Sequence, residues 1–180
     1  MELCFISKSA EDTRKLGRKF SAVVNGGDVI SLSGELGGGK TTFVPGVALA
    51  LKTKQPVSSP SFTLINIYDC YKDGKEISIV HCDLYRINKI SDISDIGLED
   101  YMFNKKYITF IEWAEKLKEE ISKNFVEIRF EYILAEDERT SLTDSENQLR
   151  KILFSPANEY WQKKIYLLNK SIEKNENIRN

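Results

Sequence analysis

The most informative part of this sequence is the glycine-rich stretch Gly34-Glu35-Leu36-Gly37-Gly38-Gly39-Lys40-Thr41. It fits the pattern G-x-x-x-x-G-K-[ST] of the phosphate-binding loop at every fixed position. Residues 29–32 before it are short, apolar and partly β-branched, which predicts a strand. Residues 41–51 after it carry apolar side chains at a spacing of four, which predicts a helix. Such a turn directs backbone N–H groups and the positive end of the helix toward a phosphate.

The last two residues of the pattern carry its chemistry. In a phosphate-binding loop the lysine ammonium reaches the β- and γ-phosphates of a nucleotide, and the next hydroxyl binds Mg²⁺. The sequence therefore predicts that Lys40 binds phosphate and that Thr41 binds the metal. The alternative is a glycine-rich turn that matches the pattern by chance, and the predicted strand and helix argue against it.

Composition indicates one soluble domain and gives no sign of bulk electrostatic binding to nucleic acid. The 180 residues suit a single domain, and 41% hydrophobic residues are enough to build a core. A formal net charge of -1 and a pI of about 6.0 give no general electrostatic attraction to DNA or RNA.

The cysteines and the N-terminus predict a cytoplasmic location. Cys4, Cys70 and Cys82 are odd in number, are widely spaced and form no C-x-x-C pair, so they indicate neither disulfides nor a zinc site. Residues 1–20 lack the apolar core of a signal peptide, and no apolar run is long enough to span a membrane.

The first part of the chain predicts the remaining elements of an α/β sheet. Residues 3–6 predict a strand, and Ser9 with Asp12 predicts the start of a helix. Residues 62–71 and 75–83 are rich in β-forming side chains and are joined by a short turn, which predicts an antiparallel hairpin.

Two further strands are predicted, at residues 107–111 and 125–134, with short helices at 90–103 and 114–121. Residues 135–148 read as a polar loop, in which a strand near 139–142 stays open. We therefore expect a P-loop NTPase-like, three-layer α/β domain over residues 1–154, with a mixed central sheet that includes the hairpin.

The C-terminal part predicts one last helix. Ser155 and Pro156 are typical of a helix start, as the cap and the first-turn proline. Apolar residues at helical spacing follow on one face, namely Trp161, Ile165, Leu168 and Ile172. We expect residues 155–180 to form a helical extension that packs on, or trails from, the same domain.

A phosphate-loop enzyme also needs a carboxylate at the end of a neighbouring strand to help hold Mg²⁺. Asp83 and Glu112 each end a run of strand-forming residues, and ligands bind at the carboxyl ends of strands in α/β folds. The alternative for each is a solvated acid at a strand–loop junction. His81 points to the same side of its strand as Asp83, and the sequence leaves its role and that of Arg86 open.

From about residue 13 to residue 132 the chain resembles the bacterial TsaE (YjeE) family, the ATPase of tRNA threonylcarbamoyladenosine biosynthesis. The order and spacing of five stretches are together more specific than the phosphate loop alone. These stretches are Leu32-Ser33-Gly34-Glu35-Leu36-Gly37-Gly38-Gly39-Lys40-Thr41-Thr42-Phe43, Ser59-Pro60-Ser61-Phe62-Thr63-Leu64, His81-Cys82-Asp83-Leu84-Tyr85-Arg86, Ile96-Gly97-Leu98-Glu99-Asp100-Tyr101 and Ile111-Glu112-Trp113.

The resemblance implies ATP and Mg²⁺ as ligands and gives each site residue a role. Thr41 and Glu112 would hold the metal, and Lys40, Asp83 and Glu112 would support hydrolysis. Residues 59–63 would form a switch-like loop that senses the γ-phosphate. The nucleotide would be bound by Thr13, in the adenine pocket, and by Gly37, Gly38, Gly39, Lys40, Thr41, Thr42, Ser61 and Trp113.

The resemblance also implies two protein partners, a TsaB-like and a TsaD-like protein, of which the second transfers the threonylcarbamoyl group to tRNA. The chain would be a weak ATPase that these partners activate, and it would reset the complex between turnovers. It would meet tRNA only through that complex and would bind neither DNA nor a membrane.

Four positions depart from the usual family pattern. The family more often has Asp at Glu35 and Ala at Gly38, and Ser61 replaces a usual threonine while keeping the hydroxyl. Pro45 occupies a position that is often basic, so a partner contact made by that basic residue would be lost.

Three other functions compete with this reading. A small GTPase would need N-K-x-D, and residues 104–107 read Asn-Lys-Lys-Tyr, which lacks the final Asp. A nucleotide or small-molecule kinase would need an arginine-rich lid, and the arginines here are few and scattered. A nucleotide-switch module without turnover is hardly distinguishable by sequence from a slow ATPase.

Overall fold

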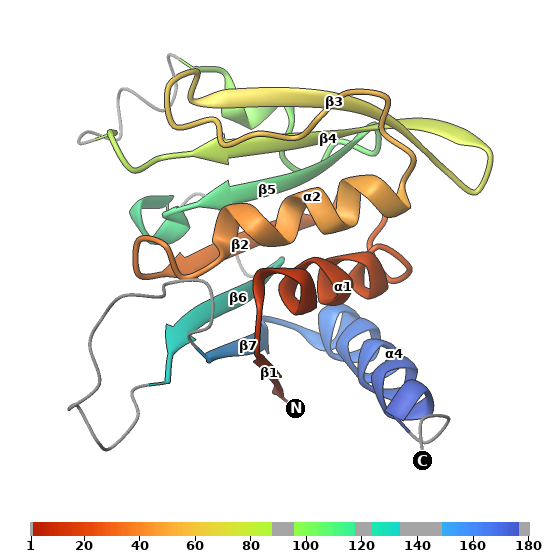
Figure 1. Cartoon of the computed structure of the whole chain (residues 1–180). Coiled ribbons are helices and arrows are strands. Elements are labelled where there is room, and N and C mark those ends of the chain that lie inside the picture. The colour runs from red at the N-terminus through yellow and green to blue at the C-terminus, as the bar shows by residue number, and fades with distance from the viewer. Residues whose placement is uncertain (1, 88–95, 118–123, 134–148, 177–180) are drawn as a thin grey trace.

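The computed structural model describes residues 2–87, 96–117, 124–133 and 149–176, and these form a mixed sheet with helices packed on it (Figure 1). The strands are β1 (Leu3–Ser7), β2 (Val29–Gly34), β3 (Ile65–Lys72), β4 (Lys75–Asp83), β5 (Tyr107–Glu112), β6 (Phe125–Tyr132) and β7 (Arg150–Pro156). The helices are α1 (Ala10–Phe20), α2 (Lys40–Ala50) and α4 (Glu159–Glu176), with 3₁₀ turns η1 (Leu98–Asp100) and η2 (Ala114–Leu117).

The seven strands lie in the order β1-β7-β6-β2-β5-β4-β3. β2 pairs in parallel with β5 and β6, and β4 pairs in parallel with β5, whereas β3–β4, β6–β7 and β1–β7 are antiparallel. The carboxyl ends of β2, β4, β5 and β6 therefore share one edge of the sheet, where the glycine-rich loop leaves β2 (Figure 1). The predicted α/β class, mixed sheet and antiparallel hairpin are confirmed.

α1 begins where the sequence predicts. The Ser9 hydroxyl oxygen accepts the backbone N–H of Asp12 at 3.1 Å, which satisfies one of the free donors of the first turn. The helix ends at Phe20, and Val23 and Val24 follow it in the connection to β2.

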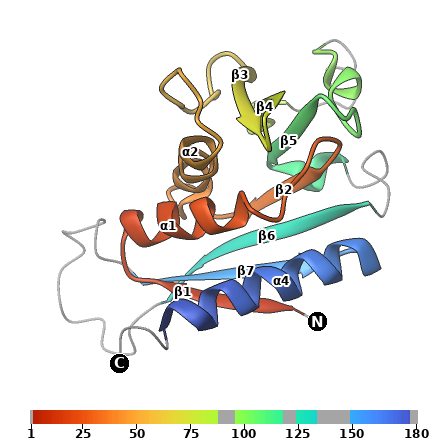
Figure 2. The same cartoon turned by 90° about the vertical axis from the view of Figure 1, so that its right-hand side faces the viewer.

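α1 and α2 pack against each other on one side of the sheet (Figure 2). Glycines allow this close approach, since a Cβ at Gly46 would lie 2.2 Å from the Arg14 carbonyl oxygen and one at Gly17 would lie 2.4 Å from that of Phe43. The core beneath them is rich in buried aromatic rings from both helices, two strands and α4, namely Phe20, Phe43, Phe130, Phe154 and Trp161.

A second, smaller core covers the opposite face of the sheet next to β4 and β5. It contains Cys82 and Ile111 from these strands, and Leu98 and Leu117 from the two 3₁₀ turns. Short turns thus cover this face near the acidic strand ends, whereas long helices cover the other.

The predicted helix start at Ser155 and Pro156 is wrong. These residues end β7, which pairs with both β1 and β6, and Ile152 and Phe154 alternate into the core. A proline is tolerated at the end of a strand, where its missing N–H costs no ladder bond. α4 begins at Glu159, and the Asn158 side-chain oxygen accepts the backbone N–H of Trp161 at 3.0 Å.

The sequence analysis places the boundary between the ATPase-like domain and its C-terminal extension between residues 154 and 155. β7 continues across this boundary. Four residues of α4 are buried in the main core with α1 and α2, namely Trp161, Ile165, Leu168 and Ile172. No helix in the described part of the chain is long and apolar enough to cross a membrane.

Smaller differences concern element boundaries. β3 begins at Ile65 rather than at residue 62, because a turn in which Leu64 N–H donates to Pro60 O precedes it. η2 is a 3₁₀ turn of four residues where a helix over 114–121 was expected. The expected turns at 90–95, the end of that helix and the open strand near 139–142 lie outside the described residues.

Candidate functional site

The loop between β2 and α2 has the backbone conformation that its glycines permit. Gly34, Gly37 and Gly39 have positive φ angles of 115°, 77° and 109°, a region that other residues rarely adopt. At Gly34 the space is also closed, because an added Cβ would lie 2.0 Å from the Phe130 carbonyl oxygen. Gly39 caps α2, so the first N–H groups of the helix face the loop.

Lys40 is folded back onto this loop. Its ammonium donates to the carbonyl oxygens of Gly34 at 2.7 Å and Glu35 at 2.8 Å, and it lies 4.5 Å from the centre of the Trp113 ring. Only 4% of the residue is exposed. Burial lowers the pKa of the ammonium below its ordinary value, although Glu112 and Asp83 act in the opposite direction.

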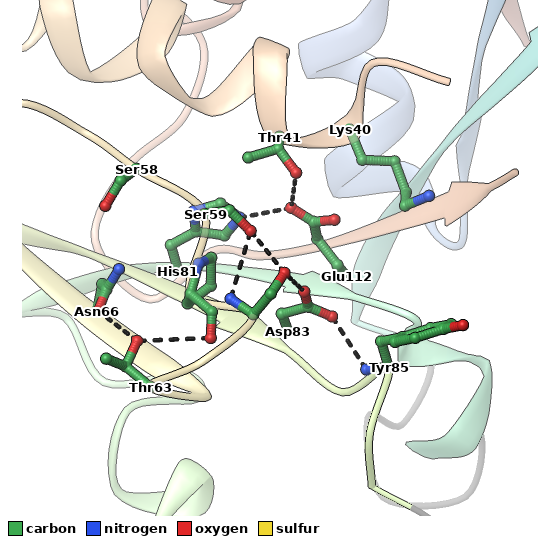
Figure 3. Close-up of polar contacts among 12 residues, drawn as sticks. Lys40, Thr41, Ser58, Ser59, Thr63, Asn66, His81, Asp83, Tyr85 and Glu112 are labelled. Atoms are coloured by element: carbon green, nitrogen blue, oxygen red, sulfur yellow. Dashed lines mark hydrogen bonds and ion pairs between the residues drawn. The ribbon is translucent and has the colours of Figure 1, made fainter. Parts of the chain in front are cut away.

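Thr41 and Glu112 are joined directly (Figure 3). The Thr41 hydroxyl donates to Glu112 Oε1 at 2.8 Å, and the same oxygen lies 2.8 Å from Nε2 of His81. Both His81 and Glu112 are buried. The contact between His81 and Glu112 follows from the parallel pairing of β4 and β5. This pairing aligns Asp83 with Glu112 and His81 with Phe110, so His81 lies diagonally across from Glu112.

Asp83 lies beside Glu112 but has its own partners. The Ser61 hydroxyl donates to Asp83 Oδ2 at 2.6 Å, and the Tyr85 N–H donates to Oδ1 at 3.0 Å (Figure 3). Ser61 also lies 2.7 Å from the Ser59 hydroxyl. The loop implied to sense a phosphate is thus hydrogen-bonded to the acid at the end of β4.

The other end of that loop is held by Tyr68. The Tyr68 hydroxyl accepts the Ser58 N–H and donates to the Ser58 carbonyl, both at 3.1 Å. Phe62, which follows Ser61 in the chain, is 86% exposed, and the Arg86 guanidinium lies 4.5 Å from its ring centre. Arg86 is therefore stacked on Phe62 in this structure.

A cavity of about 140 Å³ lies between the glycine loop and the strand ends. It brings together most of the predicted site residues, and its lining consists of Leu36, Gly37, Gly39, Lys40, Thr41, Thr42, Ser61, Asp83, Tyr85, Glu112 and Trp113.

Two predicted nucleotide-binding residues do not line this cavity. The Gly38 N–H donates within the loop to Glu35 O at 3.1 Å. Thr13 is buried in α1, and its hydroxyl lies 2.8 Å from that of Ser7.

Trp113 owes its position to an uncommon backbone conformation. Its φ is +62°, which is rare for a bulky residue, and its N–H donates to Leu32 O at 3.1 Å. The indole consequently stands next to Lys40 and 5.3 Å from the Tyr85 ring.

The sequence analysis does not predict two residues that lie next to the glycine-rich loop, Tyr132 and Arg150. A Cβ at Gly37 would lie 2.9 Å from the Tyr132 hydroxyl, and one at Gly39 would lie 3.6 Å from Arg150 Cδ. Tyr132 ends β6 and Arg150 begins β7, and the two are paired across the sheet. The alternation of apolar residues after Arg150 was the available signal for that strand.

The residues present fit the ligands that the family resemblance implies. A hydroxyl and a carboxylate in contact, Thr41 and Glu112, offer the hard oxygen ligands that Mg²⁺ prefers. Within the described ranges no three His, Cys, Asp or Glu side chains are arranged so that together they could hold a metal ion, and Mg²⁺ beside a phosphate loop does not need such a group. The glycine loop and the N-terminus of α2 suit a phosphate.

Comparison with known proteins identifies the same part of the chain. Residues 7–141 match the family described as threonylcarbamoyl adenosine biosynthesis protein TsaE. The chain is 34% identical to the tRNA threonylcarbamoyladenosine biosynthesis protein TsaE of Treponema pallidum over 134 residues, which cover 74% of this chain and 94% of that protein. It is 36% identical to the Bacillus subtilis protein of the same name over 118 residues, which cover 66% and 70% of the two chains.

A solved structure extends the similarity to the whole fold. The crystal structure of Bacillus subtilis YdiB superimposes with a TM-score of 0.70 at 26% sequence identity, covering 95% of this chain and 96% of that one. The chain therefore belongs to the TsaE family of tRNA threonylcarbamoyladenosine biosynthesis proteins.

Proposed function

We propose that this protein is an Mg²⁺-dependent ATPase that acts with TsaB-like and TsaD-like proteins in the threonylcarbamoyladenosine modification of tRNA. One observation carries the proposal. The two residues that end the phosphate-loop pattern, Lys40 and Thr41, face two acids that end neighbouring strands, Asp83 and Glu112. This is the arrangement that phosphoryl-transfer enzymes use to bind a nucleotide and a metal.

Each residue has a distinct task in this proposal. Lys40 exchanges the carbonyl oxygens of the loop for the β- and γ-phosphates, and Thr41 and Glu112 hold the metal. Bound Mg²⁺ supplies positive charge where negative charge develops on the phosphates. Asp83 exchanges the Ser61 hydroxyl for the attacking water and orients it.

The contacts around the site favour slow turnover by the isolated chain. Lys40 is bonded to the loop, and Asp83 is bonded to Ser61. Arg86 is stacked on Phe62 rather than directed at the phosphate site. A partner that rearranges residues 59–63 would free Asp83, and a cation supplied in trans raises such rates by roughly 10³–10⁵-fold.

The activity also implies where the protein works. Substrate tRNA is met through the partner complex rather than by this chain, whose net charge is -1. We therefore also propose a cytoplasmic location and no contact with DNA or membranes.

The test is a purified tRNA modification reaction with TsaB-like and TsaD-like proteins, with and without this chain. ATP turnover is measured in the same samples, for the chain alone, with partners and with tRNA added, using ATP or GTP. We expect modification to require the chain and ATP, and turnover to rise when the partners are present. Lys40→Ala should lose both activities while the unfolding transition stays cooperative.

Two results would contradict the proposal. Fast turnover by the chain alone, unchanged by partners, would indicate a self-sufficient enzyme such as a small kinase. Full modification with no nucleotide consumed would indicate a binding module.

A further inference from the structure

Ser58, which precedes the loop of residues 59–63, is bonded to a hydroxyl with no hydrogen-bonding capacity left. The Tyr68 hydroxyl accepts the backbone N–H of Ser58 and the side-chain N–H of Asn66, and it donates to the Ser58 carbonyl oxygen, each at 3.1 Å. A phenol has one donor and two acceptor lone pairs, so all three are used. The Tyr68 ring is buried in the main core, with 5% of the residue exposed. The start of the loop is therefore bonded to a side chain that the core holds in place.

Asn66 connects this attachment to the other end of the loop. Its side-chain oxygen accepts the Thr63 hydroxyl at 2.7 Å (Figure 3), and its side-chain nitrogen donates to the Tyr68 hydroxyl. Asn66 and Tyr68 lie two residues apart on β3, so both side chains point to the same face of the sheet. One chain of hydrogen bonds thus joins Thr63 to Ser58, and with them the two ends of the loop.

The backbone after Thr63 ties the same end of the loop to the acid that ends β4. The Leu64 N–H donates to Pro60 O at 2.7 Å, and the Leu64 carbonyl oxygen accepts the N–H of Asp83 at 2.9 Å. Leu64 has a φ of +65°, which is uncommon for a residue other than glycine, and it turns the chain from the loop into β3. The second end of the loop is therefore fixed to the backbone of Asp83.

Given the proposed function, we infer that Tyr68 and Asn66 are positioning residues that hold the loop in place for the γ-phosphate. Between the two attached ends, Ser61 donates to Asp83 Oδ2 at 2.6 Å and lines the cavity beside the glycine-rich loop. The γ-phosphate lies beside Asp83 in the proposed function, so the Ser61 hydroxyl turns from Asp83 to that phosphate when ATP binds. A loop that is attached before binding loses little freedom on binding, which favours affinity. ADP lacks the γ-phosphate and is bound without this exchange.

The test compares ADP with the non-hydrolysable ATP analogue AMPPNP, each with Mg²⁺, in calorimetric titrations. The variants are Tyr68→Phe, which removes only the hydroxyl, Asn66→Leu, which removes both amide contacts at similar size, and the double variant. Tyr71→Phe is the matched control, because Tyr71 lies on the same strand and its hydroxyl donates to Glu76, outside the loop. Urea unfolding of every variant reports folding independently.

We expect Tyr68→Phe to weaken AMPPNP binding roughly 3- to 10-fold, the effect of about one net hydrogen bond, and to leave ADP binding within about 2-fold of wild type. Asn66→Leu should show the same selectivity for the triphosphate. The double variant should lose less than the product of the two single losses, because both residues belong to one network. Tyr71→Phe should match wild type with both nucleotides. A residue that only stabilised the fold would not separate the two nucleotides.

Other results overturn the inference. Wild-type AMPPNP affinity in Tyr68→Phe, or equal weakening of both nucleotides, would show that the hydroxyl does not position the loop for the γ-phosphate. Single losses that multiply in the double variant would show two independent attachments instead of one network. If wild type binds neither nucleotide, the proposed function fails together with this inference. AMPPNP binding that depends on Lys40 but not on Tyr68 would overturn this inference alone.

Discussion

Nε2 of His81 and Oε1 of Glu112 lie 2.8 Å apart in a buried hydrogen bond, on the same oxygen that accepts from Thr41. Because a carboxylate can only accept, Nε2 must be the protonated nitrogen. Nδ1 is buried and has no hydrogen-bond partner among the described residues. The histidine thus holds in one orientation the carboxylate that we propose as a metal ligand, which is the usual task of a residue behind such a ligand.

His81→Phe should weaken metal binding because it removes one of the two donors that orient the Glu112 carboxylate. Loss of such a supporting residue typically costs about 10- to 100-fold in metal affinity. Mn²⁺ titration by paramagnetic resonance in the presence of ADP measures it. His81→Gln places an amide donor near the same point and is the control, which should recover most of the affinity. Equal affinities in both variants would assign His81 to packing alone.

The two acids should differ in their effect on the metal. Glu112 contacts Thr41, whereas Asp83 contacts Ser61 and the Tyr85 backbone. We expect Glu112→Gln to weaken Mn²⁺ binding and Asp83→Asn to leave it near wild type while ATP hydrolysis falls. The same titration, paired with a phosphate-release assay, measures both. A metal site weakened only by Asp83→Asn would reverse these roles.

Local patterns predicted the elements around the phosphate loop well, because their signals lie within a few residues. The glycines, Lys40 and Thr41 stand at fixed spacings. Ser9 caps α1 by accepting the backbone N–H of Asp12, only three residues later. The register that brings His81 to Glu112 is different, since it depends on which strands are neighbours. No spacing within either strand shows that β4 lies beside β5.

β7 shows how a local signal can mislead. Ser155-Pro156 is typical of a helix start, and sequence reasoning follows that propensity. In the fold, pairing with β1 and β6 and the burial of Ile152 and Phe154 outweigh it. The sequence analysis also did not place Arg150 in the site. Arg150 begins β7, and a sequence that does not reveal this strand gives no reason to put the residue beside the phosphate loop, more than a hundred residues earlier.

Trp161→Ala should destabilise the protein strongly. The indole is fully buried and stacks on Phe20 at a centroid distance of 6.4 Å, so α4 contributes directly to the main core. Truncating a buried tryptophan typically costs about 3–5 kcal/mol. Urea unfolding followed by circular dichroism measures the change, and Tyr166→Ala on the exposed face of α4 is the control. Equal midpoints for both variants would mean that α4 does not stabilise the domain.

Gly46→Ala should also destabilise, through backbone crowding. The new Cβ would lie 2.2 Å from the Arg14 carbonyl oxygen, so α1 and α2 would have to move apart. Overpacking of this kind costs roughly 1–3 kcal/mol, although alanine favours helices more than glycine. Leu49→Ala, on the exposed side of the same helix, is the control in the urea experiment. A Gly46→Ala protein more stable than wild type would show that the two helices separate without cost.

Tyr160 should make stability depend on pH in the alkaline range. Burial, with the hydrogen bond from its hydroxyl to Asp28 Oδ1 at 2.8 Å, raises the pKa of Tyr160 to about 12. The same carboxylate is bonded to Lys164, which joins α4 to the residues before β2. An unfolded tyrosine ionises near pH 10, so between about pH 10 and 12 the unfolded state loses its proton first.

The stabilisation by Tyr160 is therefore complete below about pH 10 and disappears as the pH rises toward 12. Tyr160→Phe lacks both the hydrogen bond and the titration, so it should be less stable than wild type at pH 8. Urea midpoints measured from pH 8 to 11.5 should converge for the two proteins, because ionisation of the other tyrosines affects both equally. Phenolate absorbance of the folded proteins gives a second measurement, in which wild type should show one late-titrating group that the variant lacks. If the difference in urea midpoint between wild type and Tyr160→Phe stays constant over this range, Tyr160 ionises as it does in water. The hydrogen bond to Asp28 then does not stabilise the protonated form of Tyr160.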